Sequence, residues 1–481
     1  MTLFKQIYGL IFILLFFSAF VIFFIPNSGF FYIVGTTLAV ALLFIIFCLY
    51  NKKYYIFLKE SLKTKPIKIL LILCLYIISV WLIHYFLIYL KLPISYYLVR
   101  LPRFFIYLFS SILFPITGLF LGIKFKNIIK LFYISIMIIL LAGFIQYFSF
   151  LFNIRYIDYL FDFFTNLRIF YEFPDSCKEN MRIFSIFGEP SAFGQYIFII
   201  TPYIVALTKS KYKLFKNNYI NLLFKKSFIP ILISDIVFTK SPIYLILCFI
   251  EILILLCVFH YKLIKKLRYF IVSIILTIIL IIILQYSILE KSVSDSFLYR
   301  IINTIYSFGN FNKLIFLEPS LATRIIYYYN HFLVFKQNLL FGCGFYNADI
   351  YLNHSLLSSS LPVTPEVITR YYNTSYSVGT AYSLIWTSLA EFGLVGISLY
   401  ISFVISNISK LKKCLSLYSG IEKVFCLGTL FSIIAMFIIS FYNLSFDSTL
   451  VWIIYGLSLL YIIPPDYFCI INAKIIRGNN V

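Results

Sequence analysis

The chain has 481 residues, of which 62% are hydrophobic and 12% are charged. Soluble domains are about half apolar and about a quarter charged, so this composition excludes a soluble globular protein. The net charge of +22 would favour a nucleic-acid partner in a soluble chain, but here the charges cluster in short stretches between long apolar runs. The apolar residues must therefore face lipid. The positive charge then reflects which segments lie on the inner side of the membrane, and no nucleic-acid partner is expected.

Apolar runs long enough to cross a membrane recur along the whole sequence, since a span needs about 20 residues. The sequence thus predicts an all-α, polytopic integral membrane protein that forms a single transmembrane domain over residues 1–481. About twelve spans are expected, and the seventh is the least secure because Lys225 and Lys226 interrupt it. The predicted spans are 6–25, 30–50, 68–90, 104–122, 129–150, 190–208, 220–239, 241–259, 269–289, 381–406, 424–445 and 449–463.

Lys and Arg are distributed unequally over the segments between these spans. With the N-terminus inside, most of them fall in short inner segments, which predicts that both termini are cytoplasmic. Two outer segments, 151–189 and 290–380, are too long to be simple connections. Both are rich in Tyr and Phe. We expect them to fold as interfacial helices and to cover a site on the outer face.

The stretch RIFSIFGEPSAFGQY, residues 182–196, directly precedes the sixth predicted span. Pro190 suits the first turn of a helix, with Glu189 or Gly188 as its cap, so the helix N-terminus should open on the outer face. Its backbone N–H groups and positive dipole end would favour an anion, and Arg182 could add a bidentate donor for a phosphate. The alternative is that Arg182 pairs with Glu189 and merely caps the helix.

A second candidate is the predicted helix at 321–340, LATRIIYYYNHFLVFKQNLL. Arg324, Tyr327 or Tyr328, and His331 recur at helical spacing and should share one face. That face would present a cation, a phenol and an imidazole. The alternative is an amphipathic interfacial helix whose arginine reaches toward the water.

Other residues could assist at the outer face. His331 and His354 are the histidines predicted to lie there, and either could act as a general base, although a loop histidine is more often plain surface. Lys240, at the outer end of the seventh span, could contact a phosphate or be an ordinary interfacial lysine. Gly342 and Gly344 indicate a helix stop where the backbone approaches another group closely.

Carboxylates inside predicted spans mark either function or structural ion pairs. They are Asp235, Glu251, Glu391 and Asp447. No Walker loop, GxSxG elbow, HExxH helix or CxxC pair occurs in the sequence, so no cofactor and no metal are expected. Energy for a reaction on the outer face would come with the substrate, and a lipid-linked diphosphate is the natural activated donor there.

Four stretches together resemble bacterial O-antigen polymerases and the related O-antigen ligases. RIFSIFGEPSAFGQY is similar to the segment before a middle span of that superfamily, and FTKSPIYLI to its T-x-S turn. TRIIYYYNHFLVFKQNLLFGCGF resembles the large-loop pattern of an arginine, an amphipathic helix and a GxG-like turn. SLIWTSLAEFGLVGISLYI resembles the next span, with an E-x-G-x-x-G signature at Glu391, Gly393 and Gly396. Order, spacing and predicted topology agree over about residues 130–406.

The resemblance implies an inverting, metal-independent, GT-C-like membrane glycosyltransferase. It would polymerise undecaprenyl-diphosphate-linked oligosaccharide repeat units into a surface polysaccharide, either the O-antigen of lipopolysaccharide or a capsule. Arg182, Arg324 and Lys240 would hold the diphosphate, and Glu189 and His331 are the candidate catalytic residues. A chain-length regulator and a flippase of the same pathway would be partners.

Two departures and one rival leave alternatives open. Tyr382 and Ser383 stand where ligases usually carry a His-Asn pair, which favours a polymerase over a ligase. Pro242 stands where an arginine commonly follows the T-x-S turn, which weakens the anion-binding role of that corner. A flippase or polysaccharide exporter would have a similar number of spans, but it predicts short outer loops and charges that line a central cavity.

Overall fold

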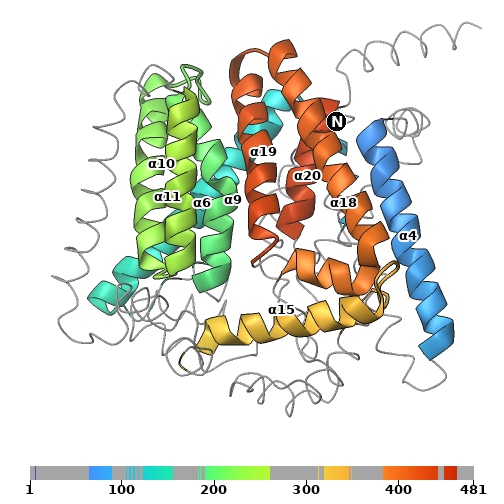
Figure 1. Cartoon of the computed structure of the whole chain (residues 1–481). Helices are drawn as coiled ribbons and strands as arrows, with labels where there is room; N and C mark the ends of the chain where they lie inside the picture. The colour runs from blue at the N-terminus through green and yellow to red at the C-terminus, as the bar shows by residue number, and fades with distance from the viewer. Residues whose placement is uncertain are drawn as a thin grey trace, which may run out of the picture. The chain divides into compact units, whose positions relative to one another are not determined.

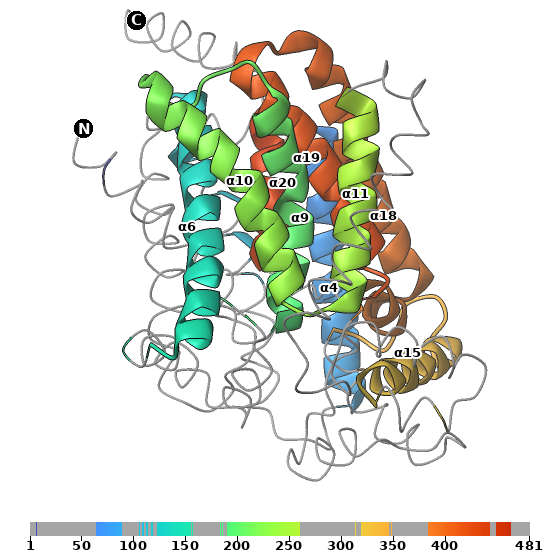
Figure 2. The same ribbon diagram turned by 90° about the vertical axis from the view of Figure 1, so that its left-hand side faces the viewer.

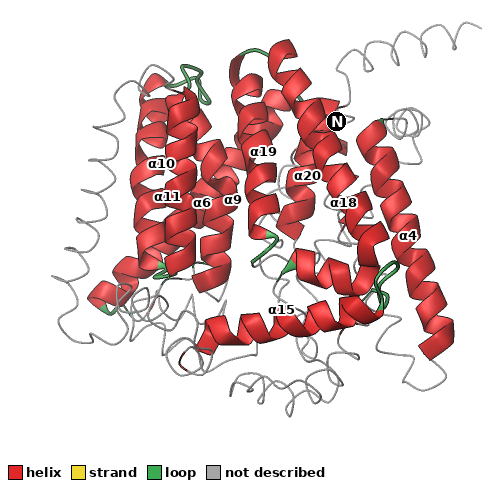
Figure 3. Cartoon of the chain, in the orientation of Figure 1, coloured by secondary structure: helices red, strands yellow, loops and turns green. Residues whose placement is uncertain are grey.

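The computed structural model describes residues 64–88, 123–154, 190–259, 319–345, 383–442 and 449–462, together with isolated positions between 6 and 348. Within these residues all regular secondary structure is helical, and no strand occurs (Figure 3). The prediction of an all-α protein is confirmed for this part of the chain. The helices are α4 (Lys65–Ile88), α6 (Phe125–Phe152), α9 (Pro190–Lys209), α10 (Asn218–Phe238), α11 (Pro242–Phe259), α15 (Pro319–Gln337), α18 (Leu384–Leu417), α19 (Gly420–Ile439) and α20 (Thr449–Ile462) (Figure 1).

Five of these helices contain a stretch that is long and apolar enough to cross a membrane, which indicates a membrane protein. The stretches are Lys65–His84, Phe125–Phe152, Ser191–Lys209, Leu384–Leu417 and Gly420–Ile439. Helix α10 is not among them, because Lys225, Lys226 and Asp235 break up its apolar face, as the interrupted seventh span predicts. The predicted spans 30–50 and 269–289, nearly all of 6–25 and most of 104–122 lie outside the described residues.

The chain divides into two compact units. One consists of Met1–Phe23, Phe31–Leu131 and Thr323–Val481, and the other of Phe24–Phe30 and Phe132–Ala322. The first therefore holds α4, α18, α19, α20 and most of α15, and the second holds α9, α10, α11 and most of α6. Each unit is described by itself below.

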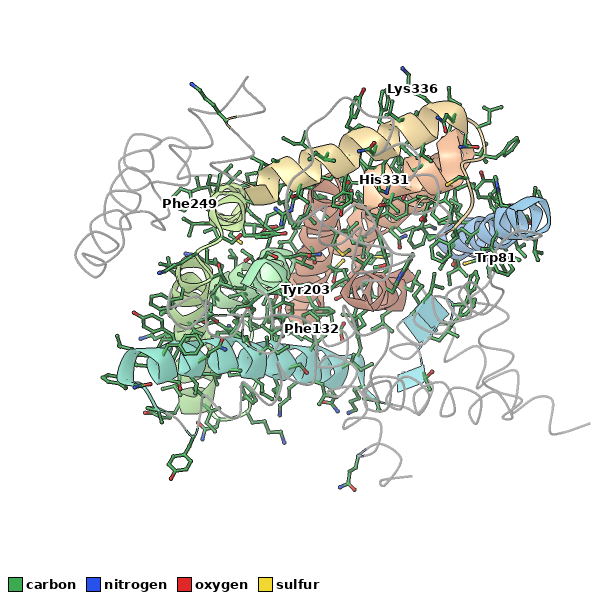
Figure 4. All side chains as sticks on the ribbon, turned by 90° about the horizontal axis from the view of Figure 1, so that it is seen from below. Trp81, Phe132, Tyr203, Phe249, His331 and Lys336 are labelled. Carbon is green, nitrogen blue, oxygen red and sulfur yellow. The ribbon has the colours of Figure 1, made fainter. Side chains whose placement is uncertain are left out.

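In the second unit, α9 packs against both α10 and α11 (Figures 1 and 2). It is the most enclosed of the five membrane-type stretches, with 83% of its apolar window buried. Tyr203 joins α9 to α6 (Figure 4). The centre of the Tyr203 ring lies 4.6 Å from that of Phe132, and the Tyr203 carbonyl accepts a hydrogen bond from the Tyr133 hydroxyl at 3.1 Å. Large buried aromatic side chains of this kind supply most of the packing between these helices.

In the first unit, α18 packs against α4, α19 and α20. Polar side chains join α18 to α20 within the apolar interior: the Tyr400 and Tyr455 hydroxyls lie 3.3 Å apart, and Ser458 donates to Asn407 at 3.0 Å. Such pairs satisfy polar atoms that would otherwise be costly to bury in an apolar interior. Helix α15 runs across the lower ends of α19 and of the longer part of α18, whereas the short first part of α18 lies alongside α15 (Figure 1).

Candidate functional site

Helix α18 is broken at Gly393, whose φ of 60° and ψ of −164° are not helical. This combination is open almost exclusively to glycine. The loop that follows α15 enters the break and pairs with the α18 backbone on both sides of Gly393. The bonds run from Cys343 N–H to Ala390 O at 2.9 Å, from Gly344 N–H to Glu391 O at 2.9 Å, from Leu394 N–H to Leu339 O at 3.0 Å and from Val395 N–H to Leu340 O at 3.1 Å. The backbone groups released by the break are thus satisfied within the fold.

Gly342 and Gly393 allow the two segments to touch backbone to backbone. A Cβ atom on Gly342 would lie 2.2 Å from the Glu391 carbonyl carbon, and one on Gly393 would lie 2.4 Å from the Leu340 oxygen. Gly342 and Gly344 have φ values of 71° and 91°, which confirms the predicted helix stop. The GxG turn and the E-x-G-x-x-G signature, which are about fifty residues apart in sequence, therefore form one structure.

Two side chains of α4 close the same junction. The Tyr76 hydroxyl donates to Phe392 O at 2.7 Å, lies 3.2 Å from Phe341 O and shares a hydrogen bond with the Gly396 backbone. His84 Nε2 lies 3.1 Å from Gly342 O. No motif in the sequence marks either residue as part of this junction. The signal that could have found them is a phenol and an imidazole, two turns apart, within an otherwise apolar span.

Arg324 lies on α15 beside Tyr442, which follows the end of α19. Its guanidinium donates to the Tyr442 hydroxyl, and its central carbon lies 4.7 Å from the centre of the Tyr442 ring. This cation–π contact holds the arginine while leaving it half-buried. Tyr328, one turn later, donates to the Tyr442 carbonyl. Burial raises the pKa of Tyr328, so its hydroxyl keeps the proton that it donates.

Aromatic rings continue this surface from α15 onto the first part of α18. The Trp386 ring stacks on Tyr328 with the centroids 6.4 Å apart and meets the Phe332 ring edge-on at 6.3 Å. Trp386 and Tyr328 are half-buried and Phe332 is exposed. The structure thus joins the predicted Arg324 to a partly exposed set of rings, Tyr328, Phe332, Trp386 and Tyr442. We call this set the aromatic platform.

His331 shares the helix of Arg324 but is fully buried (Figure 4). Its Nδ1 atom lies 2.8 Å from the Tyr327 carbonyl of the preceding turn. Burial lowers the pKa of His331 to about 4, and the contact with the Tyr327 carbonyl offsets this only in part. The imidazole is therefore neutral near pH 7, the form a general base requires. In the described conformation it is enclosed, whereas Arg324 is partly open.

Lys240 lies in the other unit, at the turn between α10 and α11. Its φ of 48° is unusual for a residue with a side chain, and its N–H donates to Val237 O at 3.1 Å. Thr239 turns inward and donates to Ile236 O at 2.7 Å. The T-x-S sequence thus forms a tight corner whose lysine is half-buried.

Ile183 and Ser185 are the described residues between Arg182 and Glu189. Ile183 N–H donates to the Phe238 carbonyl at 3.1 Å, and the Ser185 hydroxyl donates to Ile139 O at 2.9 Å. Both residues are buried inside the second unit, to which they belong. Arg182 and Glu189 themselves lie outside the described residues, as does His354, so their predicted roles stay predictions.

Buried carboxylates occur on three helices. Asp235 of α10 is fully enclosed, and neither of its carboxylate oxygens has a hydrogen-bond partner in the described part of the chain. Glu251 and Glu391 are also buried. Asp447 lies outside the described residues. Within the described ranges, no three His, Cys, Asp or Glu side chains come together as a metal site would require.

Comparison with known proteins adds no assignment to this geometry. No protein-family model matches the chain, and no curated protein matches it in sequence.

Proposed function

We propose that the protein polymerises lipid-linked oligosaccharide repeat units into a surface polysaccharide, as an integral glycosyltransferase of the bacterial inner membrane. The growing glycan would move from undecaprenyl diphosphate onto the terminal sugar of a new lipid-linked repeat unit. In this proposal the chain has twelve spans and cytoplasmic termini, and the segments 151–189 and 290–380 cover an active site on the periplasmic face.

The observation that carries the proposal is the position of Arg324 on the aromatic platform. The Arg324 side chain is half-buried, and a guanidinium can bind a diphosphate through two parallel hydrogen bonds. Exposed aromatic faces can pack against the C–H faces of sugar rings. A cation for a diphosphate beside aromatic surface for a glycan is the combination that a lipid-linked oligosaccharide requires. In a membrane protein with several apolar helices, the lipid part of such a substrate can stay in the bilayer.

The chemistry would be a single displacement with inversion. The acceptor hydroxyl forms a bond to the anomeric carbon of the growing glycan while the bond to the diphosphate oxygen breaks. The diphosphate departs with the bonding electron pair, and Arg324 stabilises the negative charge that develops on it. Arg182 and Lys240 stay sequence-based candidates for phosphate contacts. The hydroxyl proton passes to a base, for which Glu189 and His331 are the candidates.

Complementation of a host strain that lacks the gene tests the proposal. Wild type should restore a ladder of long surface glycans on a gel. Arg324→Ala and Arg182→Ala should leave a single repeat unit on the final acceptor. Arg324→Lys should restore only part of the ladder, because lysine cannot form the paired hydrogen bonds of a guanidinium. Each protein must reach the membrane in equal amount.

Lys412→Ala is the control, because Lys412 is an exposed cation near the C-terminal end of α18, far along the helix from Trp386. It should leave the ladder unchanged. Polymer stranded on the lipid carrier after deletion would instead indicate a ligase. Repeat units retained inside the cell would indicate a flippase or exporter. Full activity of both arginine variants would refute the proposed diphosphate site.

A further inference from the structure

The connection between α9 and α10 concentrates positive charge without any acidic residue of its own. The sequence from 190 to 234 contains no Asp or Glu. Six lysines lie on the connection, at the end of α9 and in the first turns of α10: Lys209, Lys211, Lys213, Lys216, Lys225 and Lys226. We call residues 209–226 the lysine loop. Its charge therefore has no local carboxylate to neutralise it.

Hydrogen bonds fix the lysine loop in one shape. Lys225 folds back, and its ammonium donates to Tyr212 O at 2.6 Å and to Ser210 O at 2.8 Å, just beyond the end of α9. There a cation also compensates the negative end of the helix dipole. The Asn221 side chain accepts from the Leu214 N–H at 2.7 Å, and Asn217 caps the start of α10. Lys225 thus holds the loop together and Lys213 donates to the Asn218 side chain at 2.5 Å, while Lys209, Lys211, Lys216 and Lys226 are exposed.

Apolar side chains are exposed next to these lysines. Tyr219 is 73% exposed and Leu223 is 59% exposed, and Tyr212, Ile220 and Leu222 are also exposed. Side chains of this kind at the end of a membrane helix suit the boundary between the acyl chains and the headgroups. Lysines beside them lie at the level of the lipid phosphates, where anionic headgroups attract each cation.

The turn between α18 and α19 provides an internal comparison. It also carries exposed lysines, Lys410, Lys412, Lys413 and Lys423. It differs from the lysine loop because Glu422 opens α19 among them. A general tendency of inner segments to be basic accounts for lysines at both places. It does not account for the absence of acidic residues from the lysine loop, and the loop also exposes several apolar side chains, whereas the α18–α19 turn exposes Leu417.

We propose that the lysine loop is a binding surface for anionic phospholipid headgroups. The exposed lysines contact the lipid phosphates, and Tyr219, Leu222 and Leu223 enter the adjoining acyl region. An acidic protein would satisfy the lysines, but it would leave these apolar side chains without a reason to be exposed. Each exposed lysine is expected to favour anionic lipid by about fivefold at low salt.

Tryptophan fluorescence can test this in vesicles of phosphatidylcholine with phosphatidylglycerol as the minor lipid. Tyr219→Trp is introduced into the full-length chain. The three native tryptophans contribute a background signal, which is measured separately with the protein that lacks this substitution. Bromine, a quencher, is placed on the acyl chains of one lipid at a time. Quenching at position 219 by brominated phosphatidylglycerol should exceed its share of the bilayer severalfold, and added salt should reduce the excess.

Changing Lys209, Lys211, Lys216 and Lys226 to Gln should return the quenching to the bulk share. The matched control changes Lys410, Lys412, Lys413 and Lys423 to Gln, which removes the same charge elsewhere and should leave the signal unchanged. An unaltered thermal unfolding midpoint shows that the variants are folded. The proposal would be overturned if, with the native lysines present, brominated phosphatidylglycerol quenched position 219 only in proportion to its share of the bilayer. It would also be overturned if the control substitutions reduced the quenching as much as the lysine-loop substitutions do. Binding of soluble polyglutamate without lipid enrichment would identify an acidic protein as the partner instead.

Discussion

Replacing Gly393 by alanine should damage the fold more than any ordinary glycine substitution in this protein. The φ of 60° and ψ of −164° at Gly393 would cost an alanine about 1–3 kcal/mol. Its Cβ would also lie 2.4 Å from the Leu340 oxygen and 2.6 Å from the Gly342 nitrogen. Both are backbone atoms, so the loop cannot rotate a side chain away and must separate from α18.

That separation breaks hydrogen bonds in a buried place. Each of the four bonds across the junction leaves a polar group unpaired when it is lost, at about 1–3 kcal/mol. Losing two of them and accepting the backbone strain gives a destabilisation of at least about 3 kcal/mol. This is a large part of the roughly 5–15 kcal/mol that keeps a protein folded.

Unfolding of the purified protein in detergent, followed by temperature and by denaturant, measures the effect. Gly143→Ala is the matched control, because Gly143 is helical and the nearest atoms to a new Cβ are the tip of the Phe193 ring at 2.7 Å. The Phe193 ring is fully buried and Asp235 Oδ1 lies 3.1 Å from the new Cβ, so the added methyl group costs about 1–3 kcal/mol of overpacking. The higher helix propensity of alanine offsets about 1 kcal/mol of this, so the control should lose no more than about 2 kcal/mol. If Gly393→Ala is as stable as Gly143→Ala, the broken helix is not required for folding.

Three further predictions concern single side chains. Tyr76→Phe removes the hydroxyl that donates a hydrogen bond to the Phe392 carbonyl. It should lower the unfolding free energy, measured in detergent, by about 1–3 kcal/mol. Below pH about 6.5 the unfolded chain protonates His331 while the folded chain does so only near pH 4, so stability should fall as pH drops through this window. His331→Asn should remove up to about 1.4 kcal/mol per pH unit of that dependence in unfolding titrations. Lys240→Gly should keep or raise stability by up to about 1 kcal/mol, because glycine accepts the φ of 48°, yet shorten the glycan ladder if Lys240 contacts phosphate.

Local sequence signals were sufficient to place most of the helices that the structure describes and much of the α15 region. Helical spacing predicted a helix at 321–340, and α15 spans Pro319–Gln337. Pro190 was expected in the first helical turn, and α9 begins at Pro190. Gly342 and Gly344 were expected to stop a helix and approach another group closely, and both lie in the loop that enters α18. These features depend on neighbours within a few residues, which is the range that periodicity reports.

The parts that could not be predicted depend on contacts between distant segments. The continuous apolar pattern at 381–406 predicted an unbroken span, and the structure instead breaks α18 at Gly393. The break is tolerated only because the loop at 339–344 satisfies its backbone, and hydropathy carries no information about such pairing. The recruitment of Tyr76 from α4 is likewise a long-range contact. Tyr442, which holds Arg324, had no motif to mark it.

The same junction gives a reason for the position of Arg324. Near its start, α15 is held where Arg324 meets Tyr442, and beyond its end the chain is held where Gly342 crosses Gly393. The helix between these two points is roughly 20 Å long, so a shift at the glycine crossing moves the whole helix and the arginine with it. Backbone bonds and a glycine contact define one end, and they leave little freedom for alternative packing. Substitutions at Gly342 or Gly393 should therefore displace Arg324 and reduce the proposed polymerase activity, even where enough folded protein remains to measure that activity.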